Sequence, residues 1–199
     1  MKKLLLTLTL LVSFVSFGQT STEYFNRGYD KAEAKDYYGA ISDYTKAIEL
    51  DPNDAVAYYN RGYSKDNLKD YNGAISDYTK AIELDPNYAD AYYNRGISKQ
   101  NLKDHYGAIS DYTKAIELNP NASDAYNNRG LSKDDLKDYY GAISDYNKAI
   151  ELEPNYALAY NNRAISKYYI NDLTGACEDA KKSASLGNDT SKVIEIVCK

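Results

Sequence analysis

The sequence predicts an all-α fold in which short helix pairs stack into a solenoid. Two observations predict it. The chain of 199 residues has four prolines, each 34 residues after the one before: Pro52, Pro86, Pro120 and Pro154. The intervals align without gaps, so that YYNRGYSKDNLKDYNGAISDYTKAIELDP is followed by YYNRGISKQNLKDHYGAISDYTKAIELNP. An uninterrupted repeat of this length indicates an extended, curved array in which neighbouring units bury each other's apolar surface.

Five copies of the unit account for residues 19–190. Their approximate bounds are 21–54, 55–88, 89–122, 123–156 and 157–190. The first four copies are nearly identical, whereas the fifth lacks the proline and follows the pattern weakly. A single unit is too small to bury its own apolar stripe, so we expect stability to come from stacking.

Each copy is predicted to form two helices. In the second copy, Tyr58 and Gly62 fall on one side of the first helix. Ala74, Tyr78 and Ala81 recur at helical spacing along the second helix. Small residues on both helices indicate where the two helices approach closely. The proline then ends the unit, because it cannot continue a helix.

An aspartate precedes every predicted second helix and suits the N-cap position. These residues are Asp36, Asp70, Asp104, Asp138 and Asp172. Three residues later each copy has a glycine, for example Gly73 after Asp70. Glycine inside a helix costs about 1 kcal/mol relative to alanine, and the sequence gives no reason for keeping it.

Residues 191–199 are predicted to form a short helix that caps the end of the stack. Val193, Ile194, Ile196 and Val197 are expected to cover the last repeat, while the charged residues face water. The chain has two cysteines, Cys177 and Cys198. A disulfide is one possibility and two buried thiols are the other, and the sequence does not choose between them.

The first residues differ from the repeats and are predicted to be a signal peptide, residues 1–18. Two lysines precede an apolar run, and small residues stand before Gln19. The protein is therefore expected to be exported, either to the periplasm or as a secreted protein. Removing residues 1–18 takes away two of the 24 basic residues and none of the 29 acidic ones, which changes the net charge from −5 to −7. Such a chain is a poor candidate for nucleic-acid binding, and no later apolar run has the length needed for stable membrane insertion.

The only histidine, His105, stands near Ser110 and Asp111 and so raises the question of nucleophilic catalysis. The repeats answer it, because the other copies place tyrosine or leucine at the position of His105. Residues of a catalytic site are not expected to recur in every repeat while the histidine that would act as the base is replaced by tyrosine or leucine. No CxxC pair, His–Cys cluster, phosphate-binding loop or nucleophile elbow is present in the sequence. We therefore expect no enzymatic activity, no metal and no cofactor.

The period and the pattern of small, aromatic and proline residues resemble the tetratricopeptide repeat (TPR) family. In the second copy this pattern comprises Tyr58, Gly62, Tyr71, Ala74, Tyr78, Ala81 and Pro86. The copies resemble in particular the bacterial repeats with an NRG motif in the first helix and GAI-DY-KAIEL in the second. The resemblance implies a right-handed superhelix of helix pairs whose first helices line a concave groove. It also implies a protein or peptide partner and a non-catalytic scaffold or adaptor, which the predicted export would place in the bacterial cell envelope.

One departure from the family is a charged residue in each helix. Every first helix has an arginine before the small residue, and every second helix has an aspartate 16 residues later. The predicted ion pairs include Arg61 with Asp77, Arg95 with Asp111, and Arg129 with Asp145. The alternative is that the arginines form a basic ladder that grips acidic ligands. We favour the structural pairs, because the aspartates recur in step with the arginines.

An asparagine precedes each arginine and is the main candidate for peptide binding. The five residues are Asn26, Asn60, Asn94, Asn128 and Asn162. A side-chain amide can hydrogen-bond to a peptide group whatever the side chains of the bound segment are. The family resemblance points the same way, because related arrays line peptide grooves with such asparagine ladders. Aromatic residues beside the ladder are further candidates: Phe25, Tyr59, Tyr93 and, one turn later, Tyr63. An alternative function is carbohydrate or cell-wall binding, in which tyrosines stack on sugars.

Overall fold

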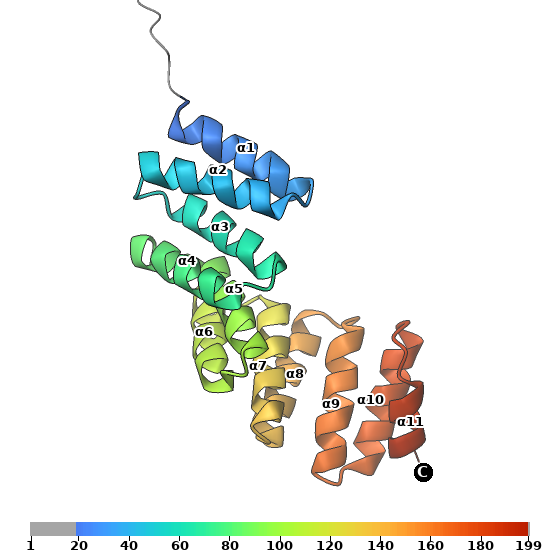
Figure 1. The fold of residues 1–199 in the computed structure, drawn as a ribbon. Helices are drawn as coiled ribbons and strands as arrows, with labels where there is room; N and C mark the ends of the chain where they lie inside the picture. The colour runs from blue at the N-terminus through green and yellow to red at the C-terminus, as the bar shows by residue number, and fades with distance from the viewer. Residues whose placement is uncertain (1–18, 199) are drawn as a thin grey trace, which may run out of the picture.

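Figure 1 shows helices that stack pairwise along a curved line. The computed structural model describes residues 19–198, which form eleven α-helices and no strand. The predicted all-α solenoid is therefore confirmed. The predicted signal peptide, residues 1–18, lies outside the described residues. Within the described part of the chain, no helix combines the length and the apolar character needed to cross a membrane.

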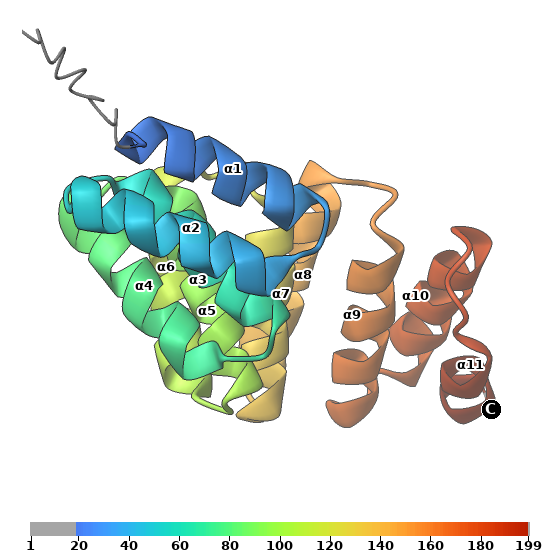
Figure 2. The same cartoon turned by 45° about the horizontal axis from the view of Figure 1, so that its top comes forward.

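Helices α1 to α10 form five pairs, and each first helix begins at the first residue of a predicted copy. In chain order the helices are α1 (Ser21–Glu33), α2 (Tyr37–Leu50), α3 (Ala55–Asn67), α4 (Tyr71–Leu84), α5 (Ala89–Asn101), α6 (His105–Leu118), α7 (Ser123–Asp135), α8 (Tyr139–Leu152), α9 (Ala157–Tyr169), α10 (Leu173–Ser185) and α11 (Ser191–Val197). Each helix packs against its partner and against the next pair. The turned view in Figure 2 shows the resulting continuous stack, with the colours following chain order from end to end.

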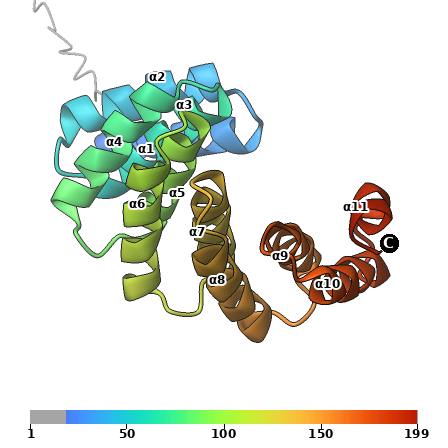
Figure 3. The ribbon, with the colours of Figure 1, turned by 90° about the horizontal axis from the view of Figure 1, so that it is seen from below.

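The stack curves so that the odd-numbered helices lie on its inner side. Consecutive odd-numbered helices, from α1 to α9, contact one another, whereas the even-numbered helices of the described chain do not. Figure 3 shows this arrangement from below, with α7 and α9 toward the inside of the curve and α8 and α10 toward the outside. We call the exposed faces of α1, α3, α5, α7 and α9 the inner surface.

The turn within each pair explains the glycine that the sequence left unexplained. The Asp70 side chain caps α4 by accepting a hydrogen bond from the Gly73 N–H, at 3.0 Å. A Cβ atom on Gly73 would lie 2.1 Å from Asp70 Oδ2. Any other residue would therefore displace the cap. The same pair of residues caps α2, α6, α8 and α10.

The residue before each cap has a left-handed backbone conformation, although it is not glycine. These residues are Lys35, Lys69, Lys103, Lys137 and Asn171, with φ between 61° and 66°. The left-handed residue reverses the chain between the two helices of a pair. A lysine there costs on the order of 1 kcal/mol, which the packing of the two helices offsets.

The core of each of the first four pairs is a tyrosine ring against a glycine. Tyr44, Tyr78, Tyr112 and Tyr146 of the second helices are fully buried. A Cβ atom on Gly62 would lie 2.9 Å from the Tyr78 ring, so the glycine makes room for it. Tyr58, on the same side of α3 as Gly62, is only half-buried, and its ring centroid lies 5.4 Å from the Arg61 guanidinium carbon. The Arg61 guanidinium, which belongs to the ion pair described next, therefore covers part of the Tyr58 ring.

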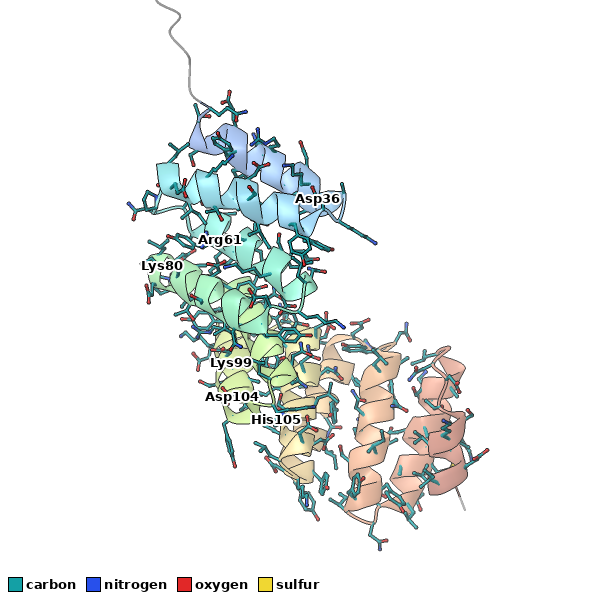
Figure 4. All side chains as sticks on the ribbon, viewed as in Figure 1. Asp36, Arg61, Lys80, Lys99, Asp104 and His105 are labelled. Carbon is teal, nitrogen blue, oxygen red and sulfur yellow. A yellow bond between two sulfur atoms is a disulfide. The ribbon has the colours of Figure 1, made fainter. Side chains whose placement is uncertain are left out.

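Arg61 of α3, labelled in Figure 4, and Asp77 of α4 form a bidentate ion pair. The Arg61 Nε and Nη2 atoms donate to Asp77 at 2.9 and 2.7 Å. Lys65 Nζ lies 2.7 Å from the same carboxylate, which is almost fully buried. Equivalent triads join α5 to α6 and α7 to α8, where Arg95 pairs with Asp111 and Arg129 with Asp145. The first and fifth pairs repeat the arrangement.

The same arginines connect one repeat to the one before it. Arg61 Nη1 donates to Thr45 Oγ1 of α2, and Arg95 Nη1 donates to Thr79 Oγ1 of α4. In the second, third and fourth repeats the guanidinium thus binds an aspartate in its own repeat and a threonine hydroxyl in the preceding one, and in the fifth repeat Arg163 bonds to Asn147 Oδ1 instead. This geometry differs from a basic ladder open to acidic ligands. In the first repeat, the hydrogen bonds from Arg27 lower the pKa of Asp43 to about 2.

The C-terminal helix α11 packs on α9 and α10. Val197 is buried against the alanines of the last pair, and Val193 and Ile194 pack beside it. The expectation that Ile196 also covers the stack is wrong, because 51% of this side chain is exposed. Helical geometry places it about 100° from Val197, away from the core. Lys199 lies outside the described residues.

A disulfide between Cys177 of α10 and Cys198 holds α11 in place, with an S–S distance of 2.03 Å. We expect reduction to lower the free energy of unfolding of the last repeat by about 3 kcal/mol, because the bond closes a loop of this length. The measurement is hydrogen exchange with and without reductant, which should accelerate in α10 and α11 and leave α3 and α4 unchanged. Unaltered exchange in α11 after verified reduction would show that its apolar contacts suffice.

Candidate functional site

One apolar side chain per repeat projects from the inner surface. These residues, spaced 34 apart in the sequence, are Tyr29, Tyr63, Ile97, Leu131 and Ile165. None is buried, and Tyr63 is 44% exposed. The cores of the first four pairs are formed by the buried tyrosines and alanines, and the core of the fifth by alanines. The row therefore offers one apolar contact per repeat to another molecule.

The asparagine ladder lies beside this row, and part of its hydrogen-bonding capacity joins the repeats. Asn94 Nδ2 donates to the Tyr59 hydroxyl of the preceding repeat at 2.8 Å, and Asn128 Nδ2 donates to Tyr93 at 2.9 Å. Asn162 Nδ2 donates to Asn127 Oδ1 at 3.0 Å. The predicted peptide-binding residues are thus also links between neighbouring first helices.

The first two members of the ladder differ from the other three. Asn60 donates to the Val56 carbonyl of its own helix at 2.8 Å. Asn26, in the first repeat, is exposed. The amides therefore offer different free groups along the surface.

Phe25, Tyr59 and Tyr93 are half-buried and serve packing as well as the surface. Their ring centroids lie 5.6 to 5.8 Å from the buried tyrosines Tyr44, Tyr78 and Tyr112. Burial raises the pKa of Tyr59 and of Tyr93 to about 12, so both hydroxyls remain protonated hydrogen-bonding groups. Of the four predicted aromatic site residues, Tyr63 is the most exposed.

Two hollows lie between successive first helices on the inner surface. One, of about 320 Å³, lies between α5 and α7 and is lined by Ile97, Gln100 and Asn128 among others. The next, of about 360 Å³, lies between α7 and α9 and is lined by Leu131, Asn162 and further residues. Volumes of this size accommodate individual side chains of a bound segment. Asn128 and Asn162 thus lie where such side chains would enter.

Asp134 lines the second hollow and accepts a hydrogen bond from Ser166 of the next repeat at 2.8 Å. Its counterpart in the second repeat, Asp66, accepts a hydrogen bond from Ser98 at 2.5 Å. Burial raises the pKa of both aspartates. Asp135 is exposed and lines both hollows, together with a lysine in each. The inner surface is therefore apolar along the row from Tyr29 to Ile165 and polar at the ends of the first helices.

His105 lies at the start of α6, next to the Asp104 cap (Figure 4). Its Nδ1 atom lies 3.3 Å from Asp135 Oδ2 of the following repeat. His105 therefore belongs to the joint between the third and fourth repeats. Residues 19–198 contain no group of three or more His, Cys, Asp or Glu side chains placed to hold a metal ion.

Sequence reasoning missed Gln100 as a lining residue of the inner surface, whereas it included Asp135 among the aspartates expected to make the groove acidic. Gln100 occupies the last turn of a first helix, where the five copies differ from one another. Variation between nearly identical repeats in this turn indicated residues that the shared fold does not constrain. The partners of the asparagines were not predictable in the same way, since they depend on how far each repeat rotates relative to the next.

Sequence models described as tetratricopeptide repeat match residues 21–54, 43–76, 89–122 and 123–156. A further model, described as TPR repeat, matches residues 67–103. Together these matches extend over residues 21–156, which is more than half of the chain. No curated protein sequence matches the chain significantly.

Several solved structures have the same fold. The crystal structure of MamA protein is 28% identical, with a TM-score of 0.79, and the match covers 86% of this chain and 94% of that one. MamA from Desulfovibrio magneticus is 22% identical, with a TM-score of 0.81, covering 85% and 96%. YrrB, described as a TPR protein with an unusual peptide-binding site, is 24% identical, with a TM-score of 0.78, covering 88% and 91%. At 22% and 24% identity, the last two similarities concern the fold alone.

Proposed function

Because this chain belongs to the tetratricopeptide repeat family, whose solenoids serve as protein–protein interaction scaffolds, we propose that it holds an extended segment of a partner protein along its inner surface. The observation that carries the proposal is the row of apolar side chains, one per repeat, from Tyr29 to Ile165, of which three are exposed and two, Ile97 and Leu131, are half-buried. The scaffold is non-catalytic, and binding energy is spread along the row.

The spacing of the repeats suits an extended segment. Packed helices lie about 8–10 Å apart, and an extended chain advances about 3.3 Å per residue. Roughly every third residue of the segment therefore meets the next first helix. Its side chains contact the apolar row, while the amide oxygens of Asn94 and Asn162 accept hydrogen bonds from its backbone. YrrB, which shares the fold, is described as having a peptide-binding site of its own.

We place this activity in the bacterial cell envelope, after export. Two features support this location: the three-part leader in residues 1–18 and the disulfide between Cys177 and Cys198, which suits an oxidising compartment. The intact mass of the protein isolated from fractionated cells should correspond to a chain that begins at Gln19. A mass that includes residues 1–18, in a cytoplasmic fraction, would contradict the proposed location.

The proposed binding surface can be tested with linear peptides selected by display on the purified protein. We expect Leu131→Ser to weaken the selected peptides about tenfold, since burial of a leucine side chain contributes about 1.5–3 kcal/mol. Fluorescence polarisation of labelled peptides measures the effect. The matched control is Tyr106→Ser on α6, where the side chain is 76% exposed on the outer side and no change is expected.

Equal affinity for Leu131→Ser and the unmodified protein would place binding elsewhere on the molecule. The carbohydrate alternative makes a different prediction. In that case the protein would retain cell-wall fragments, and the display experiment would yield no binding peptide. Tyr63→Ala would then abolish the retention of the fragments.

A further inference from the structure

The third repeat lacks a tyrosine that its neighbours have at the end of the unit. Tyr88 and Tyr156 are the last residues of the second and fourth repeats, and Ala122 stands at this position in the third. All three residues immediately precede an odd-numbered helix. The first repeat also lacks the tyrosine and has Asp54 there, and Ser123 follows Ala122 where the second and fourth repeats are followed by alanine. The second and fourth repeats therefore show what a tyrosine at this position does.

In the neighbouring repeats, the tyrosine covers the beginning of the inner surface. The Tyr88 ring packs on the Tyr59 ring with centroids 4.8 Å apart, and both side chains are half-buried. The Tyr156 hydroxyl donates a hydrogen bond to Asp124 Oδ1 at 2.5 Å. Each ring thus occupies space between two successive first helices.

At Ala122 this space is open. Tyr93 is the counterpart of Tyr59 in the third repeat, and no aromatic side chain from position 122 lies over its ring. A hollow of about 230 Å³ is present there instead, lined by Tyr93, Ala122, Ala89 and Ala125 among others. The two neighbouring repeats show that an aromatic ring is the natural occupant of such a space.

The edges of the hollow determine what can accompany an aromatic side chain. Asp90 and Asp124 line it, and both are exposed. Asn119, Asn121 and Ser123 add neutral polar groups, and no lysine or arginine is among the lining residues. A positive charge adjacent to the aromatic group would therefore face two carboxylates, whereas a negative charge would be repelled.

We propose that the hollow between Tyr93 and Ala122 is a specificity pocket of the inner surface. It takes one aromatic side chain of the partner segment, Phe or Tyr, with a neighbouring Lys or Arg that faces Asp90 and Asp124. The aromatic side chain restores the ring contact that Tyr88 makes with Tyr59 in the second repeat. The inference rests on the proposed function, because it assigns the pocket to the segment that the inner surface holds.

Capped dipeptides test the pocket without knowledge of the partner. N-acetyl-Phe-Lys-amide, titrated into ¹⁵N-labelled protein, should shift the amide resonances of Ala122 and Ser123. The variant Ala122→Tyr should weaken this binding about tenfold, since its own ring fills the hollow as in the neighbouring repeats. N-acetyl-Phe-Glu-amide should bind about threefold more weakly than the lysine peptide, and N-acetyl-Ala-Lys-amide should give no shifts at Ala122.

A gain-of-function variant provides the matched control. Tyr88→Ala should uncover Tyr59 and create a second set of shifts around residue 88 with the same dipeptide. Shifts that persist in Ala122→Tyr, or no shifts around Ala122 at the solubility limit of the dipeptide, would overturn the proposal.

The two proposals fail in distinguishable ways. Selected peptides that depend on Leu131 but bind Ala122→Tyr as well as the unmodified protein would overturn the pocket and support the scaffold. Dipeptide shifts that Ala122→Tyr abolishes, with no linear peptide bound, would establish an aromatic site and overturn its assignment to a partner segment.

Discussion

Replacing Asp111 with alanine is expected to lower the free energy of unfolding by about 3–5 kcal/mol, the range measured when one partner of a buried ion pair is removed. The Asp111 side chain is only 4% exposed. It accepts hydrogen bonds from Arg95 at 2.9 and 2.7 Å and lies 2.8 Å from Lys99 Nζ. Its loss leaves two half-buried cations without a counter-charge. Urea unfolding followed by circular dichroism measures the change.

Two further variants separate the charge from other effects. Asp111→Asn keeps the size of the side chain and one acceptor oxygen, so we expect it to be less destabilising than alanine. Lys114→Ala breaks only the exposed pair with Glu117 in the same repeat, and should change stability by less than about 1 kcal/mol. If Asp111→Ala and Lys114→Ala lowered the free energy of unfolding by similar amounts, the buried triad would contribute no more to stability than an exposed ion pair.

Replacing Tyr112 with alanine should be comparably destabilising, by about 3–5 kcal/mol, as for other large buried aromatic side chains. The ring is fully buried between α5 and α6, and its hydroxyl donates to Gln100 at 2.8 Å. Its removal opens a cavity at the centre of the third pair and leaves Tyr93 without its ring contact. Calorimetric melting and urea unfolding both report the loss.

The fifth repeat suggests a compensating substitution. There, Ala164 stands at the glycine position and Ala180 at the tyrosine position, and both are buried. Gly96→Ala alone should destabilise by about 1–3 kcal/mol, because its Cβ atom would lie 2.7 Å from the Tyr112 ring. Combined with Tyr112→Ala, the added methyl group instead fills part of the cavity.

We therefore expect the double variant to be more stable than the sum of the two single effects, by about 1 kcal/mol. The single variants and the double variant together form a double-mutant cycle. Strict additivity would show that Gly96 and Tyr112 do not constrain each other, and would contradict the close packing described above.

Much of the architecture was predictable because the chain repeats one unit. The helix pairs, the aspartate caps and the ion pair between Arg95 and Asp111 all follow from the spacing of residues within one copy. Other local features were not predictable. A left-handed Lys69 contradicts the usual preference for glycine, and the reason for Gly73 depends on the rotamer of the Asp70 cap.

The inner surface was predictable only in part. Regular spacing identified the asparagines and the aromatic residues as one set, but not their hydrogen bonds. Asn94 bonds to Tyr59, which lies 35 residues away in the sequence. Such a bond crosses from one repeat to the next and depends on the rotation between them. The substitution at Ala122 was visible in the sequence, although its consequence was not.

The sequence by itself determined that this protein is a stack of five helix pairs with an ion pair within each. The reason is that these features depend on contacts within one unit of fixed length, and helical periodicity expresses such contacts directly. Only the tertiary structure decided which amides are shared between repeats and where a hollow opens beside Tyr93. These features depend on the relative orientation of neighbouring units, which many side chains set together and no single position encodes.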